Sequence, residues 1–387
     1  MKVCFETFGC RLNKAEALQM EADYLADGWE VTDRHADADL FVVRGCSVTS
    51  RAQHECEKLV DHLKRHYPKA RLKVCGCLAN AMTLSTSRLR APATSQSLPL
   101  RTARAYLKVQ DGCAGNCTFC IVPRFRGKSK SEPFAALLDK AKRFIDAGYR
   151  EIVVTGCNLS LYASEGKALP DLIAALAELD AACRIRLGSL EPGGRALETI
   201  QAMSEHQNVC RFLHLAVQSG SELILKSMYR PYSSHDIDRV ASTAAKLMPN
   251  LGLGCDLMTG FPGESELDHA ATRGLLNRLP FNNAHVFPYS SRPGTPAAGF
   301  RNHVPKEIRS VRARELSALA QTKRLAFAKT FIGKTVEIVV EDEKTGRGWS
   351  GEYLTCEPVA GTPKRKSLVR LFVTKVKGDL LFGRPAR

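Results

Sequence analysis

AYLKVQDGCAGNCTFC, residues 105–120, is a short apolar strand that leads directly into a loop with three cysteines. Five more strand patterns follow, each separated from the next by a helical stretch. The predicted strands are 105–110, 151–155, 184–188, 212–217, 253–259 and 284–289, and the helices between them include 134–146, 171–182, 221–229 and 265–278. Six β/α units predict an α/β fold with a partial (β/α)6 barrel of TIM type, whose chemistry lies at the C-terminal ends of its strands.

The residues before this core, which we place at 105–330, predict a separate domain and a linker. Residues 1–83 alternate strands with helices, which indicates a Rossmann-like parallel sheet. Residues 84–104 have no sustained period and are rich in Ser, Thr, Pro and Arg, so we predict a basic linker. The N-terminal strands are predicted at 2–6, 40–43 and 72–75, and the helices at 15–26 and 51–66.

The core ends with a long basic helix at 305–331. Residues 331–387 then change character, because apolar and polar side chains alternate with a period of two between glycine-rich turns. That pattern predicts a small antiparallel β-barrel as the C-terminal domain.

The composition narrows the class of protein. The chain has 387 residues, 14 cysteines and a formal net charge of +16. It shows neither an apolar secretory leader after Lys2 nor a run of about 18 apolar residues that would span a membrane. We therefore expect a cytoplasmic protein, in which cysteines more often bind metal or take part in redox chemistry than form disulfides. The positive charge favours an anionic partner and leaves RNA, DNA and a membrane surface open.

Half of this charge is concentrated in residues 84–130, where nine basic residues stand against one acid, Asp111. A charge run is usually a solvated face, but these residues flank the cysteine loop, which favours contact with a phosphate backbone. The nine are Arg88, Arg90, Arg101, Arg104, Lys108, Arg124, Arg126, Lys128 and Lys130.

The spacing of Cys113, Cys117 and Cys120 lets three thiolates hold one metal centre from a single loop. Structural zinc normally takes four protein ligands, and no histidine occurs between His66 and His206 to complete such a site locally. Three thiolates on a four-iron cluster would leave one iron open to another ligand, which is a catalytic arrangement. The alternative is three unrelated cysteines.

This loop and its flanks, LKVQDGCAGNCTFCIVPRFRG at 107–127, resemble the radical S-adenosylmethionine (SAM) enzymes and, within them, the methylthiotransferases. The resemblance implies that Cys113, Cys117 and Cys120 hold a [4Fe–4S] cluster and form the catalytic set. The open iron would bind the amino and carboxylate groups of SAM, and reduction would cleave SAM to methionine and a 5′-deoxyadenosyl radical.

A second set of cysteines follows the three predicted N-terminal strands: Cys10 in FGCRLN, Cys46 in RGCSVTS and Cys77 in CGCLAN. Loops that leave parallel strands at their C-terminal ends converge on one edge of the sheet, so these thiols can meet in space. Spacing alone leaves coincidence open. The resemblance implies that they bind an auxiliary [4Fe–4S] cluster. The other eight cysteines are predicted to be packing residues, with Cys157 a possible neighbour of the site.

The resemblance extends over most of 105–300, and implies residues near SAM at the strand ends. These are Gly156 in TGCN, Glu191 in RLGSLEP, Gln218 in HLAVQSGS, and Asp256 ahead of GFPGE. The C-terminal stretches GKTVEIVVE and GWSGEYLTC, with the basic run 364–366, resemble the TRAM domain, an RNA-binding β-barrel.

Within the family, FGCRLNKAEA and QDGC look most like the MtaB-type branch, which acts on threonylcarbamoyladenosine. The resemblance then implies methylthiolation of carbon 2 of N6-threonylcarbamoyladenosine at position 37, in the anticodon stem-loop of tRNA, with two [4Fe–4S] clusters and two SAM. The reductant and the sulfur source are not specified, and neither DNA nor a membrane is expected as a partner. The alternatives are an isopentenyladenosine substrate, or a non-catalytic RNA-binding protein stabilised by iron–sulfur or zinc.

Overall fold

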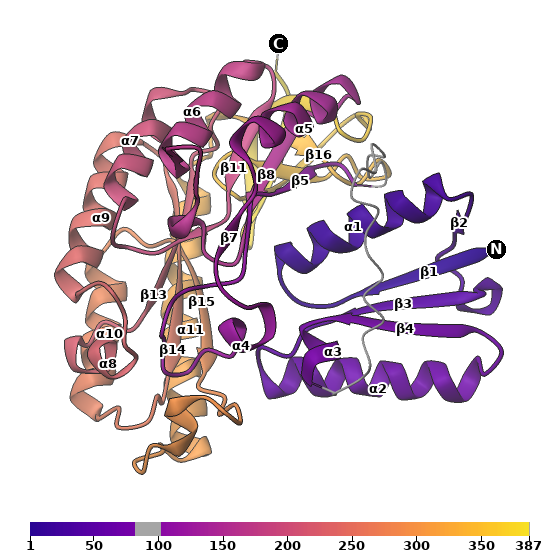
Figure 1. Cartoon of the computed structure of the whole chain (residues 1–387). Coiled ribbons are helices and arrows are strands. Elements are labelled where there is room, and N and C mark those ends of the chain that lie inside the picture. The colour runs from indigo at the N-terminus through magenta and orange to yellow at the C-terminus, as the bar shows by residue number, and fades with distance from the viewer. Residues whose placement is uncertain (82–101, 387) are drawn as a thin grey trace.

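The computed structural model describes residues 1–81 and 102–386 (Figure 1), so most of the predicted linker 84–104 lies outside the described residues. The N-terminal sheet is parallel, with strand order β2-β1-β3-β4, as the alternation predicts. Helix α1 covers one face of this sheet and α2 the other, because Val3 packs with the α1 side and Cys4 with the α2 side. The elements are β1 Lys2–Thr7, α1 Arg11–Ala26, β2 Glu30–Val31, η1 His35–Asp37, β3 Leu40–Gly45, α2 Ser50–His66, β4 Arg71–Gly76 and α3 Cys77–Ala81.

The central region is a partial parallel barrel of six β/α units, which confirms the predicted fold class. Its strands form two sheets, β11-β8-β5 and β12-β13-β14-β15, and β11 and β12 follow one another on either side of Gly188. The strands are β5 Ala105–Lys108, β8 Glu151–Thr155, β11 Arg184–Leu187, β12 Ser189–Leu190, β13 Phe212–Gln218, β14 Gly252–Thr259 and β15 Asn283–Pro288.

Helices surround the outside of these strands (Figure 1). They are α5 Phe134–Asp146, α6 Leu169–Leu179, α7 Ala196–Glu205, α8 Glu222–Ser227, α9 Ser234–Leu247, α10 Glu266–Arg278 and α11 Lys306–Lys329. Short elements fill the connections: β6 Gln110–Asp111, α4 Val122–Arg126, β7 Lys130–Ser131, η2 Leu159–Leu161, β9 Ala163–Ser164, β10 Lys167–Ala168 and η3 Pro296–Gly299. Among the described residues, no helix is both long and apolar enough to cross a membrane.

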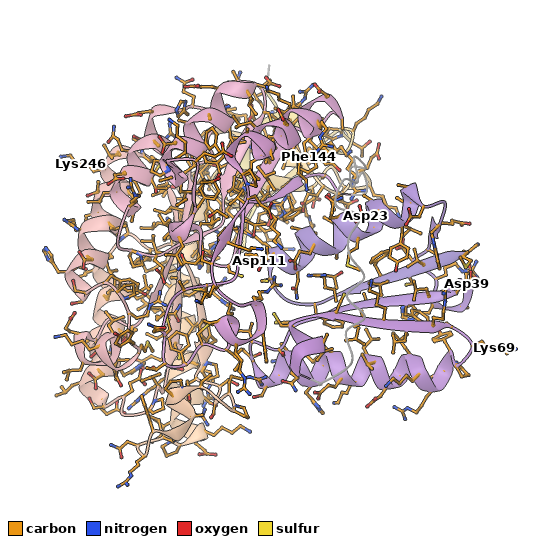
Figure 2. The ribbon with its side chains drawn as sticks, in the orientation of Figure 1. Asp23, Asp39, Lys69, Asp111, Phe144 and Lys246 are labelled. Atoms are coloured by element: carbon orange, nitrogen blue, oxygen red, sulfur yellow. The ribbon has the colours of Figure 1, made fainter. Side chains whose placement is uncertain are left out.

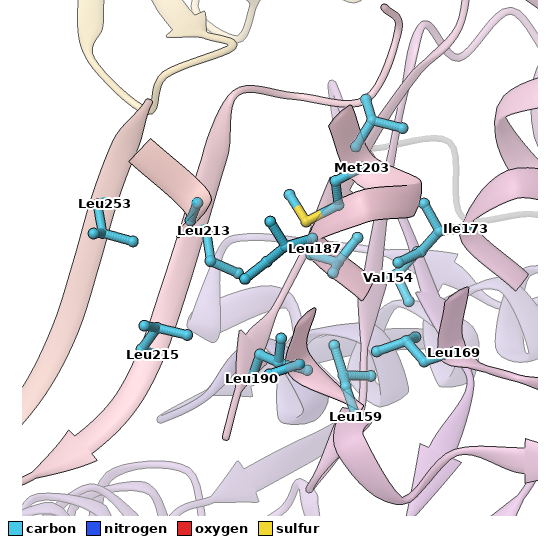
Figure 3. Packing of buried hydrophobic residues seen from close by; sticks show 14 of the residues in the cluster. Val154, Leu159, Leu169, Ile173, Leu187, Leu190, Met203, Leu213, Leu215 and Leu253 are labelled. Carbon is cyan, nitrogen blue, oxygen red and sulfur yellow. The ribbon is translucent and has the colours of Figure 1, made fainter. Parts of the chain in front are cut away.

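The two faces of the barrel strands differ in chemistry, because successive side chains point to opposite sides. Val154, Leu187 and Leu213 point outward and pack with the helices in one large apolar core (Figure 3). The opposite side, which we call the concave face, carries the intervening polar side chains: Lys108, Glu151, Arg186, His214 and Asp256.

The C-terminal domain is a closed five-stranded barrel in the order β16-β17-β18-β20-β19. Its pairs are antiparallel, as predicted, except for β18 with β20, which is parallel. The reason is geometric: strand direction cannot alternate all the way around a ring of five. The strands are β16 Thr335–Val340, β17 Gly348–Ser350, β18 Thr355–Pro358, β19 Leu368–Lys377 and β20 Leu380–Pro385.

A buried carboxylate joins this domain to the central barrel. Glu151 is fully buried, and it accepts from Arg186 Nε at 2.8 Å and from Arg184. The same two arginines donate to backbone carbonyls of the C-terminal barrel, Arg186 to Ser350 at 2.8 Å and Arg184 to Trp349 at 3.0 Å. Burial alone would raise the pKa of Glu151, but the guanidinium groups outweigh it and the pKa is lowered.

Replacing Glu151 with Gln should destabilise the protein strongly, because buried guanidinium groups lose their carboxylate. We expect the free energy of unfolding, measured with urea, to fall by about 3–5 kcal/mol. Because the pKa of Glu151 is lowered in the folded protein, the stabilisation that its carboxylate provides is present above the ordinary glutamate pKa of about 4.3. It is lost as the pH falls below that value.

The matched control is Glu337→Gln, since that carboxyl group lies 3.8 Å from Arg184 but is 45% exposed. We expect it to cost less than about 1 kcal/mol. Equal losses in the two variants would contradict the role assigned to Glu151.

Candidate cluster and cofactor site

The loop with Cys113, Cys117 and Cys120 leaves the barrel after β6 and is closed by backbone contacts at its base. Cys113 N donates to Gly127 O at 3.0 Å, and β6 pairs with β7. Gly112 has φ +66°, and a Cβ there would lie 2.1 Å from Lys128 O, so only glycine fits this closure. The three thiols are thus held on a short, well-anchored loop.

Hydrogen-bond donors surround two of these sulfurs. Arg230 Nη1 lies 3.0 Å from Cys117 Sγ, and the Gly115 amide nitrogen lies 3.3 Å from Cys113 Sγ. Asn158 Nδ2 is 4.0 Å from the same Cys113 sulfur. Burial raises the pKa of the Cys120 thiol to about 12. Donors beside sulfur favour a negatively charged sulfur, as in a bound cluster.

The spacing of the cysteine thiols fits a multi-iron cluster better than a single metal ion. In the part of the chain that the structure describes, neither cysteine set brings three ligand atoms within 4.8 Å of one another, as the ligands of one ion would be. The thiols of Cys113, Cys117 and Cys120 are each half-buried, which leaves an open side. A multi-iron cluster with one iron free suits this arrangement.

Two residues expected near SAM lie close to the loop. Glu191 accepts from Arg230 Nη2 at 2.9 Å, so one guanidinium joins Glu191 to Cys117. Gly156 packs against Gln110, since a Cβ there would lie 3.0 Å from Gln110 Oε1. The backbone therefore runs close to the base of the loop at a point where a side chain would be crowded.

The other two residues expected near SAM lie on β13 and β14. Gln218 has φ +68° and is 7% exposed, and its buried Oε1 has no hydrogen-bond partner in the described structure. A buried acceptor without a partner is costly, which suits a ligand that donates to it. Asp256 already accepts from two imidazoles, His214 at 3.2 Å and His285 at 3.1 Å.

The second cysteine set converges at one edge of the N-terminal sheet, as the strand-end rule predicts. Cys10 is the N-cap residue of α1, Cys46 follows β3 and Cys77 begins α3. Burial, together with the neighbouring thiols of Cys10 and Cys77, raises the pKa of Cys46 to about 11. Ser47 Oγ also donates to Cys77 O at 3.1 Å, which ties two of the three loops together.

Arg126 connects the two cysteine sets. Its Nη2 donates to Asn13 Oδ1 at 2.7 Å, and Asn13 Nδ2 donates to Gly45 O at 3.2 Å, beside Cys46. Its Nη1 donates to Asp111 Oδ1 at 3.0 Å, close to the start of the other loop. Figure 2 shows Asp111 where the barrel meets the N-terminal domain. Arg126 and Asn13 therefore link residues that flank the two cysteine loops.

The charges of this region correct one prediction. Arg104, Lys108 and Arg126 pair with acids of the protein itself, so they do not form a phosphate-binding surface. Lys108, for example, lies 2.6 Å from both Glu16 and Asp111. Three of the nine basic residues, Arg88, Arg90 and Arg101, lie outside the described residues.

Sequence reasoning did not identify Arg230, Glu16 or Asn13 as site residues, because no motif marks them. The eight cysteines predicted to be packing residues divide as follows. Six are buried, Cys75 is half-buried, and Cys157 lies beside the site with its sulfur 3.4 Å from Asp111 Oδ1. The six are Cys4, Cys56, Cys183, Cys210, Cys255 and Cys356.

Comparisons with known proteins agree with this architecture. The family model described as "Radical SAM superfamily" matches residues 107–276, and "Uncharacterized protein family UPF0004" matches 2–93. The radical S-adenosylmethionine methyltransferase TsrM of Kitasatospora setae, solved with cobalamin and a [4Fe-4S] cluster bound, has a similar fold. The TM-score is 0.55 at 12% identity, over 77% of this chain and 76% of that one. The central region is thus a radical SAM fold.

Two curated relatives are similar over nearly the whole chain. Threonylcarbamoyladenosine tRNA methylthiotransferase MtaB of Aquifex aeolicus is 30% identical, over 89% of this chain and 93% of the relative. A tRNA-2-methylthio-N(6)-dimethylallyladenosine synthase of Cereibacter sphaeroides is also 30% identical, over 89% and 88%. The chain belongs to the radical SAM tRNA methylthiotransferase family and is an enzyme. Membership implies SAM and a [4Fe–4S] cluster.

Replacing Gly9 with Ala should displace Cys46. Gly9 has φ +94°, and a Cβ there would lie 2.6 Å from Cys46 Cβ and 2.9 Å from its Sγ. We expect alkylation of Cys46 in the metal-free protein, followed by peptide mass spectrometry, to become several times faster.

The matched control is Gly28→Ala, because Gly28 has φ +80° with nothing within 4 Å of its added Cβ. Both variants should lose about 1–2 kcal/mol of stability to the left-handed backbone. An unchanged Cys46 alkylation rate in Gly9→Ala would contradict the close packing of Gly9 against Cys46.

Proposed function

We propose that this enzyme methylthiolates carbon 2 of N6-threonylcarbamoyladenosine at position 37 of tRNA, with two [4Fe–4S] clusters and two molecules of SAM. The observation that carries the proposal is that two cysteine sets lie on loops at strand ends, and that Arg126 and Asn13 join residues flanking these loops by hydrogen bonds. A cytoplasmic location belongs to the same proposal, since tRNA is found there.

In this proposal, Cys113, Cys117 and Cys120 hold the radical cluster. The reduced cluster and SAM would supply a carbon radical strong enough to take hydrogen from an inert C–H bond, which no side chain can do. The residues of the chain position these groups. Arg230 fixes both the Cys117 sulfur and Glu191, and Gly115 directs a backbone N–H at the Cys113 sulfur.

The groups expected to contact SAM have separate tasks. Gly156 lets the backbone pass close to Gln110 and Leu159 at the base of the cysteine loop, where a side chain would be crowded. Gln218 offers its buried Oε1, which has no hydrogen-bond partner among the described residues, to an N–H or O–H of SAM. Glu191 accepts hydrogen bonds at an orientation that Arg230 sets.

Cys10, Cys46 and Cys77 would hold the auxiliary cluster, which carries the sulfur to be transferred. Its proximity to the radical cluster suits a reaction in which hydrogen removal and sulfur addition happen at the same carbon. Cys10 is the exposed member of the set and offers access for the sulfur source. The reductant and the sulfur source remain unassigned.

The choice of tRNA substrate rests on the relatives and the sequence. The relatives named above act on threonylcarbamoyladenosine or on dimethylallyladenosine, and both are 30% identical. The N-terminal segment FGCRLNKAEA favours the first. The closed C-terminal barrel, with the basic residues Lys364, Arg365 and Lys366 between β18 and β19, suits contact with the anticodon stem-loop.

The two cysteine sets should have separable functions. We expect Cys113→Ala to abolish formation of 5′-deoxyadenosine, and Cys46→Ala to retain it while losing the methylthiolated product. Iron should fall from about eight per chain to about four in each variant after anaerobic reconstitution.

Cys183→Ala is the control, because that thiol is buried in the barrel core away from both loops. It should keep the full iron content. If Cys46→Ala kept all its iron, the auxiliary cluster would be ruled out.

The substrate can be identified from the nucleosides of bulk tRNA. In a strain that lacks the gene, the 2-methylthio derivative of threonylcarbamoyladenosine should disappear while its precursor accumulates, as measured by mass spectrometry. Loss of the 2-methylthio derivative of isopentenyladenosine would assign the chain to the other branch.

A further inference from the structure

The concave face carries a group of three side chains that the proposed chemistry does not use as a unit: His214 on β13, Asp256 on β14 and His285 on β15. The strand register places Asp256 directly opposite His285, and His214 opposite Gly254. Gly254 makes room for the group, because a Cβ there would lie 2.6 Å from His214 Nδ1. The three side chains are therefore packed as one assembly.

The hydrogen bonds give each member a distinct role. His214 Nε2 lies 3.2 Å from Asp256 Oδ2, and His285 Nδ1 lies 3.1 Å from Asp256 Oδ1. His214 and Asp256 are 16% and 23% exposed, whereas the His285 side chain is 73% exposed. Among the described residues, the Nε2 of His285 has no hydrogen-bond partner. Asp256 thus fixes the orientation of the His285 ring through Nδ1 and leaves Nε2 available to a ligand on the concave face.

This geometry favours the charged form of His285. The hydrogen bond to Asp256 raises the pKa of His285 above its ordinary value. Burial opposes ionisation of Asp256, but the hydrogen bonds from His214 and His285 outweigh it and lower the pKa of the carboxyl group. An imidazolium that donates to an anion makes a charge-assisted hydrogen bond.

The other cations near the concave face are already engaged. Lys108, Arg186 and Arg230 each pair with a carboxylate of the protein. The guanidinium of Arg11 lies over the ring of Tyr353 at 5.2 Å. Among the described residues, exposed His285 keeps a ring nitrogen, Nε2, without a hydrogen-bond partner, and it lies on the edge strand β15 of the partial barrel.

We infer that His285, oriented by Asp256, is a carboxylate-binding subsite that receives the threonine carboxylate of the substrate nucleoside. The inference rests on the proposed function, because threonylcarbamoyladenosine carries this carboxylate and isopentenyladenosine does not. His285 is then a specificity-determining residue and Asp256 its positioning residue.

The test compares anaerobically reconstituted wild-type enzyme with His285→Gln, which keeps a hydrogen-bond donor but removes the charge. Two anticodon stem-loop RNAs are used, one with threonylcarbamoyladenosine and one with the methyl ester of its threonine carboxylate. For the acid RNA, His285→Gln should raise KM, and Kd by fluorescence anisotropy, about tenfold, with kcat within about twofold of wild type. Both proteins should treat the ester RNA alike.

His235→Gln on the outer helix α9 is the matched control, because His235 is an exposed histidine far from the concave face in the fold. It should bind both RNAs as the wild type does. Equal binding of the acid RNA by wild type and His285→Gln overturns this inference alone, as does an equal loss for acid and ester. A wild-type enzyme that modifies only an isopentenyladenosine stem-loop overturns the proposed function as well.

Discussion

The largely buried carboxylate of Glu16 sets the geometry on which the site depends. It lies on α1 and pairs with cations from three other elements: Arg44 on β3, Lys108 on β5 and Arg126 on α4. Taking these charges out of water costs several kcal/mol for each ion unless partners compensate, and here every cation has a nearby acid. Burial would raise the pKa of Glu16, but the three cations lower it. The network fixes the N-terminal domain to the barrel, and with it the separation of the two cysteine loops.

Glu151 joins the C-terminal barrel to the same concave face in a similar way, with one buried carboxylate between several guanidinium groups. The Glu151 network reaches Tyr353, because Arg186 lies over that ring at 5.4 Å, and the ring stacks between Phe212 at 4.4 Å and Trp349 at 4.5 Å. Arg11, which directly follows Cys10, lies over this ring. The C-terminal barrel therefore reaches the residue next to a predicted cluster ligand, and all three parts of the chain contact one another at the concave face.

The sequence predicted those features that depend on local pattern. The strand periods predicted the sheets, and the strand-end rule brought Cys10, Cys46 and Cys77 to one edge. Sequence patterns could not predict contacts between residues distant in the chain, such as Arg126 with Asn13, because no local pattern identifies the partner residue.

The interpretation of the basic stretch was wrong at Arg104, Lys108 and Arg126 for the same reason. Counting charges along residues 84–130 finds one acid, but folding brings Glu16, Glu151 and Glu341 to Lys108, Arg104 and Arg126. Net charge within a segment therefore does not measure the charge available to a partner.

The availability of a charge to a partner also explains how His285 could distinguish the substrates of two groups of relatives, although both are 30% identical to this chain. A carboxylate beside His285 would exchange water for a charge-assisted hydrogen bond, so its desolvation is compensated. An isopentenyl group in that position would cover the imidazolium without offering an acceptor, and an unsatisfied charged donor costs more than about 1–3 kcal/mol. Discrimination would come mainly from this penalty against the apolar group, as in sites that reject an analogue lacking a polar atom. An arginine whose nitrogens all donate to protein acceptors, as those of Arg186 do, could not impose it, because it keeps no N–H for the substrate.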